Sequence, residues 1–142
     1  MSDTVTLVDY YYTTVADRPG EASRLLGVLR DRGINLLAFT GFPEGRRSQL
    51  DFVPADRTAF LAAAKAARIK LSRPKKAFLL SGDDRIGAIA DTCDRLAAAK
   101  VNITAVDAVT AGGGAGRYGA ILWVKARDVK KAADVLGAAS SP

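Results

Sequence analysis

The amino-acid sequence predicts an α+β protein made of two similar βαββαβ units, residues 1–73 and 74–142. The main observation is a repeat: DRPGEASRLLGVLRDRGIN at 17–35 returns as DRIGAIADTCDRLAAAKVN at 84–102. Its identities fall at a predicted helix start, on the apolar face of that helix and at the start of the next strand. Length agrees, because two units of about 70 residues each have marginal cores and gain stability by packing together.

The elements of the first unit follow from apolar spacing. Residues 5–16 are β-branched and aromatic, as in a strand, and a helix then starts with Pro19 at its first position and is closed by Gly33 as a left-handed cap. Residues 34–40 and 48–53 alternate as a hairpin around a turn at 41–45. An Ala-rich helix over 56–68 and a short fourth strand, IKLSRP at 69–74, complete the unit.

The second unit repeats this order from residue 75. AFLLSG is a strand, 86–99 a helix, VNITAVDAV and RYGAILWVK are strands around a Gly-rich turn, and DVKKAADVLG is a helix. No closing strand is evident after this helix, so another segment must cover that sheet edge. The unusually long first segment, 4–16, could supply the strand in this chain or in a neighbouring one.

Composition excludes several kinds of active site. The chain has no histidine, which removes Ser-His-Asp and Cys-His catalysis and His-containing zinc sites. The single cysteine, Cys93, lies in a helical apolar repeat and reads as a small buried residue. Because no metal cluster, cofactor motif or nucleophile pair stands out, we predict a protein that is not an enzyme and that holds no cofactor or metal.

The charge and the N-terminal sequence bear on partners and location. A net charge of +6 and a pI near 9.7 favour an anionic partner, but the basic residues are dispersed, as on an ordinary solvated surface. The first residues carry no secretion signal, and no apolar run approaches the roughly 18 residues of a membrane span. We therefore expect a cytoplasmic protein without a membrane partner.

Two strand-to-helix turns, at 17–20 and 84–87, are the candidate ligand sites. A helix N-terminus presents unpaired N–H groups and a partial positive charge, and glycine lets a ligand approach the backbone. In the alternative interpretation the glycines only satisfy a tight turn and the aspartates only cap the helices. Asn35 and Asn102 follow each helix; an amide offers a donor and an acceptor, although a turn-forming role explains them too.

Residues 14–39, TVADRPGEASRLLGVLRDRGINLLAF, resemble the opening of an ACT domain: a strand, a D/N-R-P-G loop, an amphipathic helix ending in G-I/V-N, and a second strand. A second copy follows, with Ile86 in place of proline and Lys100 in place of the capping glycine. The resemblance implies two ferredoxin-like ACT units side by side, with a continuous antiparallel sheet, helices on one face, and ligands, usually amino acids, at the seam.

The resemblance also implies a function and a set of site residues. The chain would be a stand-alone regulatory or sensor protein, with a regulated enzyme in trans as a possible partner and self-association as a homo-oligomer such as a dimer. A ligand carboxylate suits the helix N-terminus and arginine, and a ligand ammonium suits aspartate or an amide oxygen. The implied ligand-binding residues are Asp17, Arg18, Pro19, Gly20, Asn35, Asp84, Arg85, Gly87 and Asn102.

Three other interpretations each account for part of the sequence. G-x-G-x-x-G at 114–119 would bind a dinucleotide only between a strand and a helix, but it leads into a predicted strand, which favours a hairpin loop. RNA-recognition modules share the βαββαβ order, yet RYGAILW at 117–123 lacks their first glycine and has Ala120 where a stacking aromatic is required. An RNA-binding protein of this type is therefore kept only as a less favoured alternative, and a nucleic-acid partner is not the main expectation. A ligand-free protein-interaction scaffold with vestigial sites remains an alternative.

Overall fold

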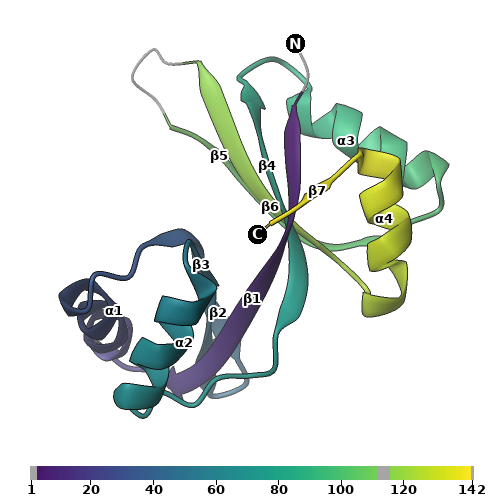
Figure 1. The fold of residues 1–142 in the computed structure, drawn as a ribbon. Helices are drawn as coiled ribbons and strands as arrows, with labels where there is room; N and C mark the ends of the chain where they lie inside the picture. Colours follow the sequence, from purple (N-terminus) through teal and green to yellow (C-terminus); the bar gives the residue numbers. More distant parts are fainter. Residues whose placement is uncertain (1–2, 112–115, 142) are drawn as a thin grey trace. The chain divides into compact units, whose positions relative to one another are not determined.

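The computed structural model describes residues 3–111 and 116–141 and is an α+β fold (Figure 1). Its main elements are β1 (Thr4–Ala16), α1 (Glu21–Asp31), β2 (Leu36–Glu44), β3 (Arg47–Pro54), α2 (Arg57–Ala66), β4 (Lys75–Asp83), α3 (Ala88–Ala98), β5 (Ile103–Thr110), β6 (Arg117–Val124), α4 (Val129–Leu136) and β7 (Ala139–Ser140). A 3-10 turn, Ala126–Asp128, precedes α4. The chain divides into two compact units: a central unit, Tyr10–Lys75, and a split unit, residues 3–9 with 76–141.

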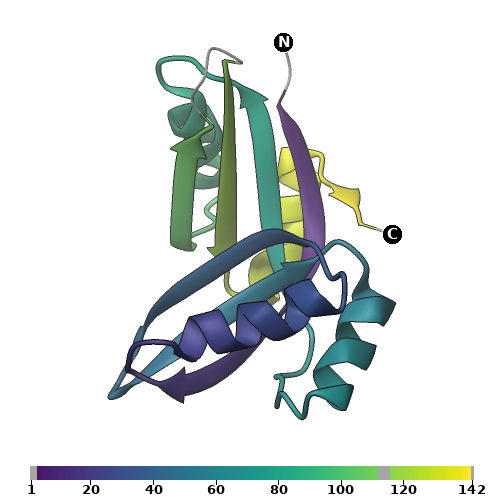
Figure 2. The ribbon, with the colours of Figure 1, turned by 90° about the vertical axis from the view of Figure 1, so that its left-hand side faces the viewer.

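Strand β1 contributes to both units. Its residues 11–16 pair antiparallel with β3 in the central unit, from Tyr11 opposite Phe52 to Ala16 opposite Arg47. Its residues 4–9 belong to the split unit, where β1 lies beside β4 and pairs in parallel with β7 (Figure 2). A short strand that the sequence did not predict, β7, does follow the last helix, but it pairs with β1 and not with β4. The strand beside β4 is therefore supplied by the first segment of this same chain, and residues 3–9 group with 76–141 in one compact unit.

The core of the central unit lies between its sheet and two helices. The strands are ordered β2-β3-β1, and α1 and α2 cover one face, because apolar side chains of β1, β3 and both helices share one cluster. Phe52 and Phe60 are 1% exposed and their rings lie 5.6 Å apart. The buried members of this cluster are Tyr11, Val15, Leu25, Leu29, Leu50, Phe52, Phe60 and Ala63.

The split unit has the same kind of core. Its strands are ordered β1-β4-β6-β5, and α3 and α4 pack on one face of them. Phe78 and Leu122 are opposite each other in the β4–β6 register and are fully buried. The buried residues here are Val5, Phe78, Leu80, Ala88, Leu96, Val101, Tyr118, Leu122, Val124, Ala132 and Leu136.

The four helices end in the same way, each followed by a residue with positive φ. These residues are Gly33, Arg68, Lys100 and Gly137. After α1 the Ile34 N–H donates to the Leu29 carbonyl at 2.9 Å, and after α3 the Val101 N–H donates to the Leu96 carbonyl at 2.9 Å. The predicted left-handed cap at Gly33 is confirmed, and Lys100 adopts the same conformation without being glycine.

The predicted fourth strand of the first unit is wrong, because residues 69–74 form no strand. They run beside β1 but join it at one residue: the Ser72 N–H donates to the Tyr12 carbonyl at 2.8 Å, and the Ser72 hydroxyl accepts from the Tyr12 N–H at 2.9 Å. A side-chain oxygen thus replaces the carbonyl that a ladder would use, and Pro74 has no N–H to donate. Ile69 and Leu71 still pack on the core.

Two smaller predictions also need correction. The turn predicted at 41–45 is shorter, because β2 continues to Glu44 and only Gly45 and Arg46 form the loop. Proline at 43 is tolerated there because β2 is an edge strand, where a missing N–H breaks no second ladder. Pro19 is not the first helical residue: it lies in the turn, and α1 begins at Glu21 after Gly20 as N-cap.

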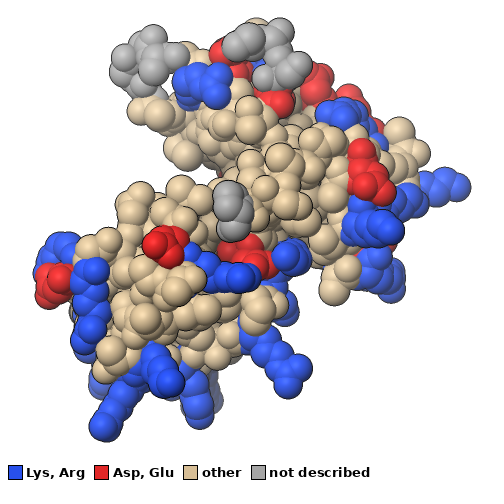
Figure 3. Space-filling model, in the orientation of Figure 1, with Lys and Arg blue, Asp and Glu red and all other residues tan. Residues whose placement is uncertain are grey.

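Charge is divided unequally along the sequence. Residues 10–75 carry twelve Lys and Arg against six Asp and Glu, whereas residues 1–9 and 76–142 carry nine of each. The net charge of +6 therefore belongs to the central unit, where blue side chains gather in the space-filling view (Figure 3).

Cys93, which the sequence predicts to be buried, is only half-buried. Over the described residues, no helix is both long and apolar enough to cross a membrane.

Candidate functional site

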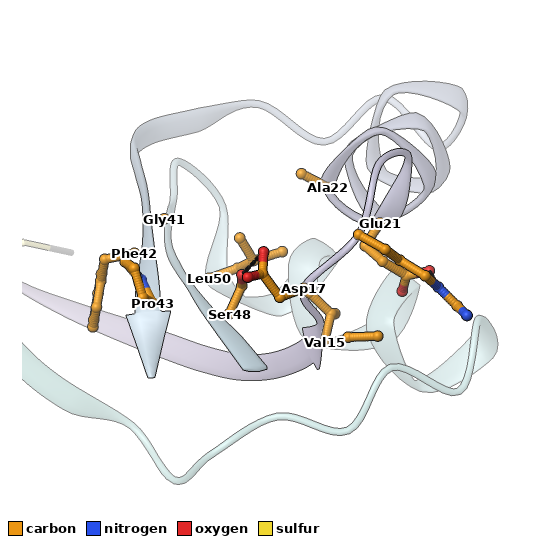
Figure 4. Close-up of a pocket in the computed structure, with 11 residues that line it drawn as sticks. Val15, Asp17, Glu21, Ala22, Gly41, Phe42, Pro43, Ser48 and Leu50 are labelled. Atoms are coloured by element: carbon orange, nitrogen blue, oxygen red, sulfur yellow. Dashed lines mark hydrogen bonds and ion pairs between the residues drawn. The ribbon is translucent and has the colours of Figure 1, made fainter. Parts of the chain in front are cut away.

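A cavity of about 280 Å³ opens at the first strand-to-helix turn of the central unit. It is bounded by the end of β1, the start of α1 and the β2–β3 hairpin (Figure 4). Its size lies near the lower end of small-molecule sites, roughly 300–1,000 Å³. The lining residues are Val15, Ala16, Asp17, Arg18, Glu21, Ala22, Gly41, Phe42, Pro43, Ser48 and Leu50.

Charged and polar groups of both signs line this cavity. The Ser48 hydroxyl donates to the Asp17 carboxylate at 3.2 Å, and the Arg18 guanidinium donates to Glu21 at 3.3 Å. Glu21 also accepts from Arg24 at 2.9 Å, and this hydrogen bond is the largest cause that lowers the pKa of Glu21 below its ordinary value. The cavity therefore presents carboxylate acceptors, a guanidinium donor that is 70% exposed, and a hydroxyl.

The opposite part of the cavity is apolar. Gly41 and Leu50 are opposite each other in the β2–β3 register, and a Cβ on Gly41 would lie 3.1 Å from Leu50 Cδ2. Pro43 is opposite Ser48 in the same hairpin, so the β2 side of the cavity presents carbon atoms. A molecule that carries opposite charges at one end and an apolar group at the other fits such a lining.

Pro19 and Gly20 were predicted as ligand residues but do not line the cavity. Gly20 is the N-cap of α1 with φ 92°, and a Cβ built on it would meet nothing within 4 Å. Its glycine is thus required by the left-handed backbone conformation, not by close packing. Neither α1 nor α3 has a side-chain cap, whereas Asp56 caps α2 by accepting from the Ala59 N–H at 3.0 Å.

Asn35 lies at the other end of α1. The eleven residues of this helix separate it from Gly20 by about 16 Å along the helix axis. Its side chain is exposed, its carbonyl accepts from the Ala55 N–H at 3.0 Å, and it does not line the cavity. The structure thus brings Asp17 and Arg18 together at the cavity, and it places Asn35 away from them.

The residues predicted at the second turn are arranged differently. Arg85 donates to both carboxylate oxygens of Asp3, at 3.0 and 3.2 Å, and to Asp91 at 3.2 Å. Gly87 is the N-cap of α3 with φ 79°. Asp84 and Asn102 are exposed, and Asn102 lies beyond the far end of α3. Of the predicted residues at the second turn, Arg85 therefore already forms ion pairs within the chain.

Sequence reasoning missed most of the cavity lining. Glu21 had a local signal, because it lies only three residues after Arg18, within reach of the arginine side chain. Gly41, Ser48 and Leu50 had no such signal. They reach the cavity through the pairing of β3 with β1 and β2, which brings Ser48 next to Asp17, about thirty positions earlier in the chain. Asp3 was likewise invisible as a partner of Arg85.

The other candidate chemistries can be placed as well. Among residues 3–111 and 116–141, no three His, Cys, Asp or Glu gather as metal ligands. Gly114 and Ala115 of the glycine motif lie outside the described residues, and Gly116 is followed directly by β6, a strand, as expected. Tyr118 is 5% exposed and belongs to the split-unit core, which leaves no free ring for base stacking at that position.

Comparison with known proteins identifies the fold. No protein-family model matches the sequence, and no curated protein sequence matches it either. Among solved structures, protein BT0572 from Bacteroides thetaiotaomicron is similar with a TM-score of 0.77 at 17% identity, over 94% of this chain and 88% of that one.

Two further solved structures are similar over nearly their whole length. Aspartokinase alpha and beta subunits match with a TM-score of 0.60 at 17% identity, over 96% of this chain and 95% of that one. The ligand-free regulatory subunit of aspartate kinase from Thermus thermophilus matches with a TM-score of 0.56 at 19% identity, over 94% of both chains. The chain therefore has the α+β fold found in aspartokinase regulatory subunits, which is consistent with the ACT-type fold that the sequence predicts.

Proposed function

We propose that this chain is a regulatory protein of the ACT type and that it binds a free amino acid in the cavity at its first turn. The observation that carries the proposal is the lining of that cavity. Its ion pair and hydroxyl lie next to an apolar wall, and its volume of about 280 Å³ suits a small ligand. The fold shared with a regulatory subunit of aspartate kinase supports a regulatory role.

In this proposal each charged group of the lining has a role. The Arg18 guanidinium donates to the ligand carboxylate, and the carboxylates of Asp17 and Glu21 accept from the ligand ammonium. Ser48 holds Asp17 in place through its hydroxyl. The side chain of the ligand then faces Leu50 and the β2 residues, so an apolar amino acid fits best.

A thermal-shift panel of the twenty free amino acids tests this function. A ligand at 100 times its Kd adds about 2.7 kcal/mol to the free energy of unfolding, which raises the Tm by several degrees in a chain of this size. We expect such a shift for one class, the apolar amino acids. Asp17→Asn should remove it, because a neutral amide attracts an ammonium less.

Asp84→Asn is the matched control, since Asp84 holds the corresponding position of the second turn and is exposed. Its shift should equal that of the unaltered protein. A panel without any shift at millimolar concentrations, or a shift that survives Asp17→Asn undiminished, would remove the cavity as an amino-acid site.

We further propose that the output passes through a partner enzyme in trans and through self-association as a homo-oligomer such as a dimer. The edge strands β2 and β5 support self-association, because they expose large apolar side chains, among them Leu37 at 53% and Val109 at 72%. Light scattering after size exclusion measures the assembly directly, and a monomer at all concentrations would contradict it.

Other parts of the interpretation stay predictions. They are the tandem ACT boundaries at 73/74, the placement of ligands at the seam, the absence of catalysis, and the cytoplasmic location.

A further inference from the structure

The two units differ at one pair of corresponding positions. In the central unit, Val15 of β1 is opposite Ser48 of β3, one residue before β1 ends, and both line the cavity. In the split unit, the pair one residue before β4 ends is Gly82 opposite Tyr118. The strand register therefore makes Gly82 and Tyr118 the counterparts of two cavity residues.

The space beside this second pair holds a carboxylate of the chain itself. Asp3, directly before β1, accepts from Arg85 through both oxygens, Nη1 to Oδ1 at 3.0 Å and Nη2 to Oδ2 at 3.2 Å. This is the paired geometry that recognises carboxylates most strongly. The Asp3 side chain is 14% exposed, so it is more enclosed than a typical surface ion pair.

Two further contacts hold the guanidinium in place. Arg85 Nη1 donates to the Asp83 carbonyl at 3.2 Å, and Nη2 donates to Asp91 Oδ2 at 3.2 Å. Since these acceptors belong to the strand end and to α3, the orientation of the arginine does not depend on Asp3 alone. Removal of the Asp3 carboxylate would leave a positioned donor pair.

Gly82 creates the room for the carboxylate. A Cβ at this position would clash with Asp3 Oδ1 and would lie 3.0 Å from Tyr118 Cε1. The hydroxyl of Tyr118 is buried and has no hydrogen bond of ordinary geometry among the described residues. Burial first, and the adjacent Asp3 carboxylate second, raise the pKa of Tyr118 to about 12.

We infer that Gly82, Arg85 and Tyr118 form a carboxylate-binding site, and that the chain fills this site with its own Asp3. An ordinary surface ion pair needs neither a side-chain-free notch nor a buried hydroxyl next to it. The ligand class is a small monocarboxylate, because the Asp3 side chain itself is a carboxymethyl group. This inference stands without the proposed function.

A consequence follows that does rest on the proposed function. If the first turn binds an amino acid, the second turn competes against a tethered carboxylate, and the chain binds one ligand instead of two. Removal of Asp3 should then add a second carboxylate site without changing the first.

Chemical rescue with acetate tests the site. Asp3→Ala removes the carboxylate and keeps the Cβ, and acetate can supply a free carboxylate in its place, so sodium acetate should raise the Tm of Asp3→Ala more than sodium chloride of equal ionic strength does. The shift should be absent in the unaltered protein and in the double variant Asp3→Ala with Arg85→Gln. Equal acetate shifts in all three proteins would overturn the inference, as would no shift in Asp3→Ala.

A second readout covers the case in which Asp3→Ala does not fold. Asp3→Asn keeps the shape but removes the charge, so the pKa of Tyr118 should fall toward its ordinary value. Carbon-13 NMR of labelled tyrosine follows this titration, with Tyr118→Phe assigning the signal. An unchanged Tyr118 titration in Asp3→Asn would overturn the inference. A flat amino-acid panel would not, which separates this test from that of the proposed function.

Discussion

The two strand-to-helix turns begin with the same Asp-Arg-x-Gly sequence, but their surroundings differ. At the first turn, Arg18 pairs with Glu21 of its own helix and a cavity remains beside Asp17. At the second turn, Arg85 pairs with Asp3 from the segment before β1, next to the notch at Gly82. Similar turns thus lead to an open site or to a filled one, depending on what a distant segment contributes.

The comparison shows that the repeated sequence determines the backbone conformation of the turn, but not which side chains surround it. Gly20 and Gly87 have φ values of 92° and 79° and are both N-caps without a side-chain hydrogen bond. The helices that follow also end with matching hydrogen bonds. What differs is the set of side chains from other elements, so sequence identity at the turn does not imply identical ligands.

The largest expected effect concerns the glycine notch. Gly82→Ala should lower the free energy of unfolding by about 2 kcal/mol, the usual cost of overpacking, because the added methyl displaces the Asp3 carboxylate. Gly119→Ala, in the adjacent strand β6, is the matched control: a Cβ there meets nothing within 4 Å. Urea denaturation measures both. Equal effects would show that the notch is not special.

The next effect concerns the matching helix ends. Lys100→Gly should raise the free energy of unfolding by about 1 kcal/mol, because a non-glycine residue pays roughly that much for a left-handed conformation. Gly33→Ala should lower it by a similar amount at the corresponding position of α1. Thermal or urea unfolding decides, and a loss of stability in Lys100→Gly would break the correspondence between the two ends.

The smallest effect compares two carboxylates with opposite pKa shifts. Hydrogen bonding from Arg85 lowers the pKa of Asp3 below its ordinary value of 3.8, so its contribution to stability is present above that pH and is lost on acidification. Burial raises the pKa of Asp51 above the same value, so the stability contributed by its protonated form is lost as pH rises through the folded-state value.

Substitution by asparagine separates these contributions. At neutral pH, Asp3→Asn should lower the urea midpoint and Asp51→Asn should raise it. The difference between the unaltered protein and Asp3→Asn should vanish in acid, where the Asp3 carboxyl is protonated and as neutral as the asparagine amide. Midpoints that move in the same direction at neutral pH would contradict the assigned causes.

The sequence predicted much of the fold because local patterns specify it. The leucines of α1 at helical spacing joined the core, as did Leu50 and Phe52 of β3. Asp51 and Val53 of β3 are buried too, so the alternation in this strand does not separate a buried face from an exposed one. The strand predicted for IKLSRP is not present, because Ser72 bonds to β1 through its side-chain oxygen. Strand preferences of residues do not include this competition between side-chain and backbone hydrogen bonds. The turn predicted at 41–45 was too long, because Pro43 indicates a loop in the sequence but lies in the edge strand β2 in the structure.

The candidate site was less predictable than the fold. Asp17, Arg18 and Arg85 were predicted as site residues because they lie inside the repeat. Gly41, Leu50 and Asp3 were not, because their roles depend on strand register between segments far apart in the chain. Pairing of this kind has no local signature.

Because β1 belongs to both compact units, the chain cannot be divided simply into two folded fragments. Because residues 4–9 complete the split unit while 10–16 complete the central one, no single cut yields two self-sufficient pieces. A fragment that begins at residue 76 loses a strand and its partner for β7, and a fragment that ends at residue 75 keeps an unpaired extension. During synthesis residues 4–9 must wait for β4 to emerge before they gain a neighbouring strand, and their pairing with β7 forms only when the last residues arrive.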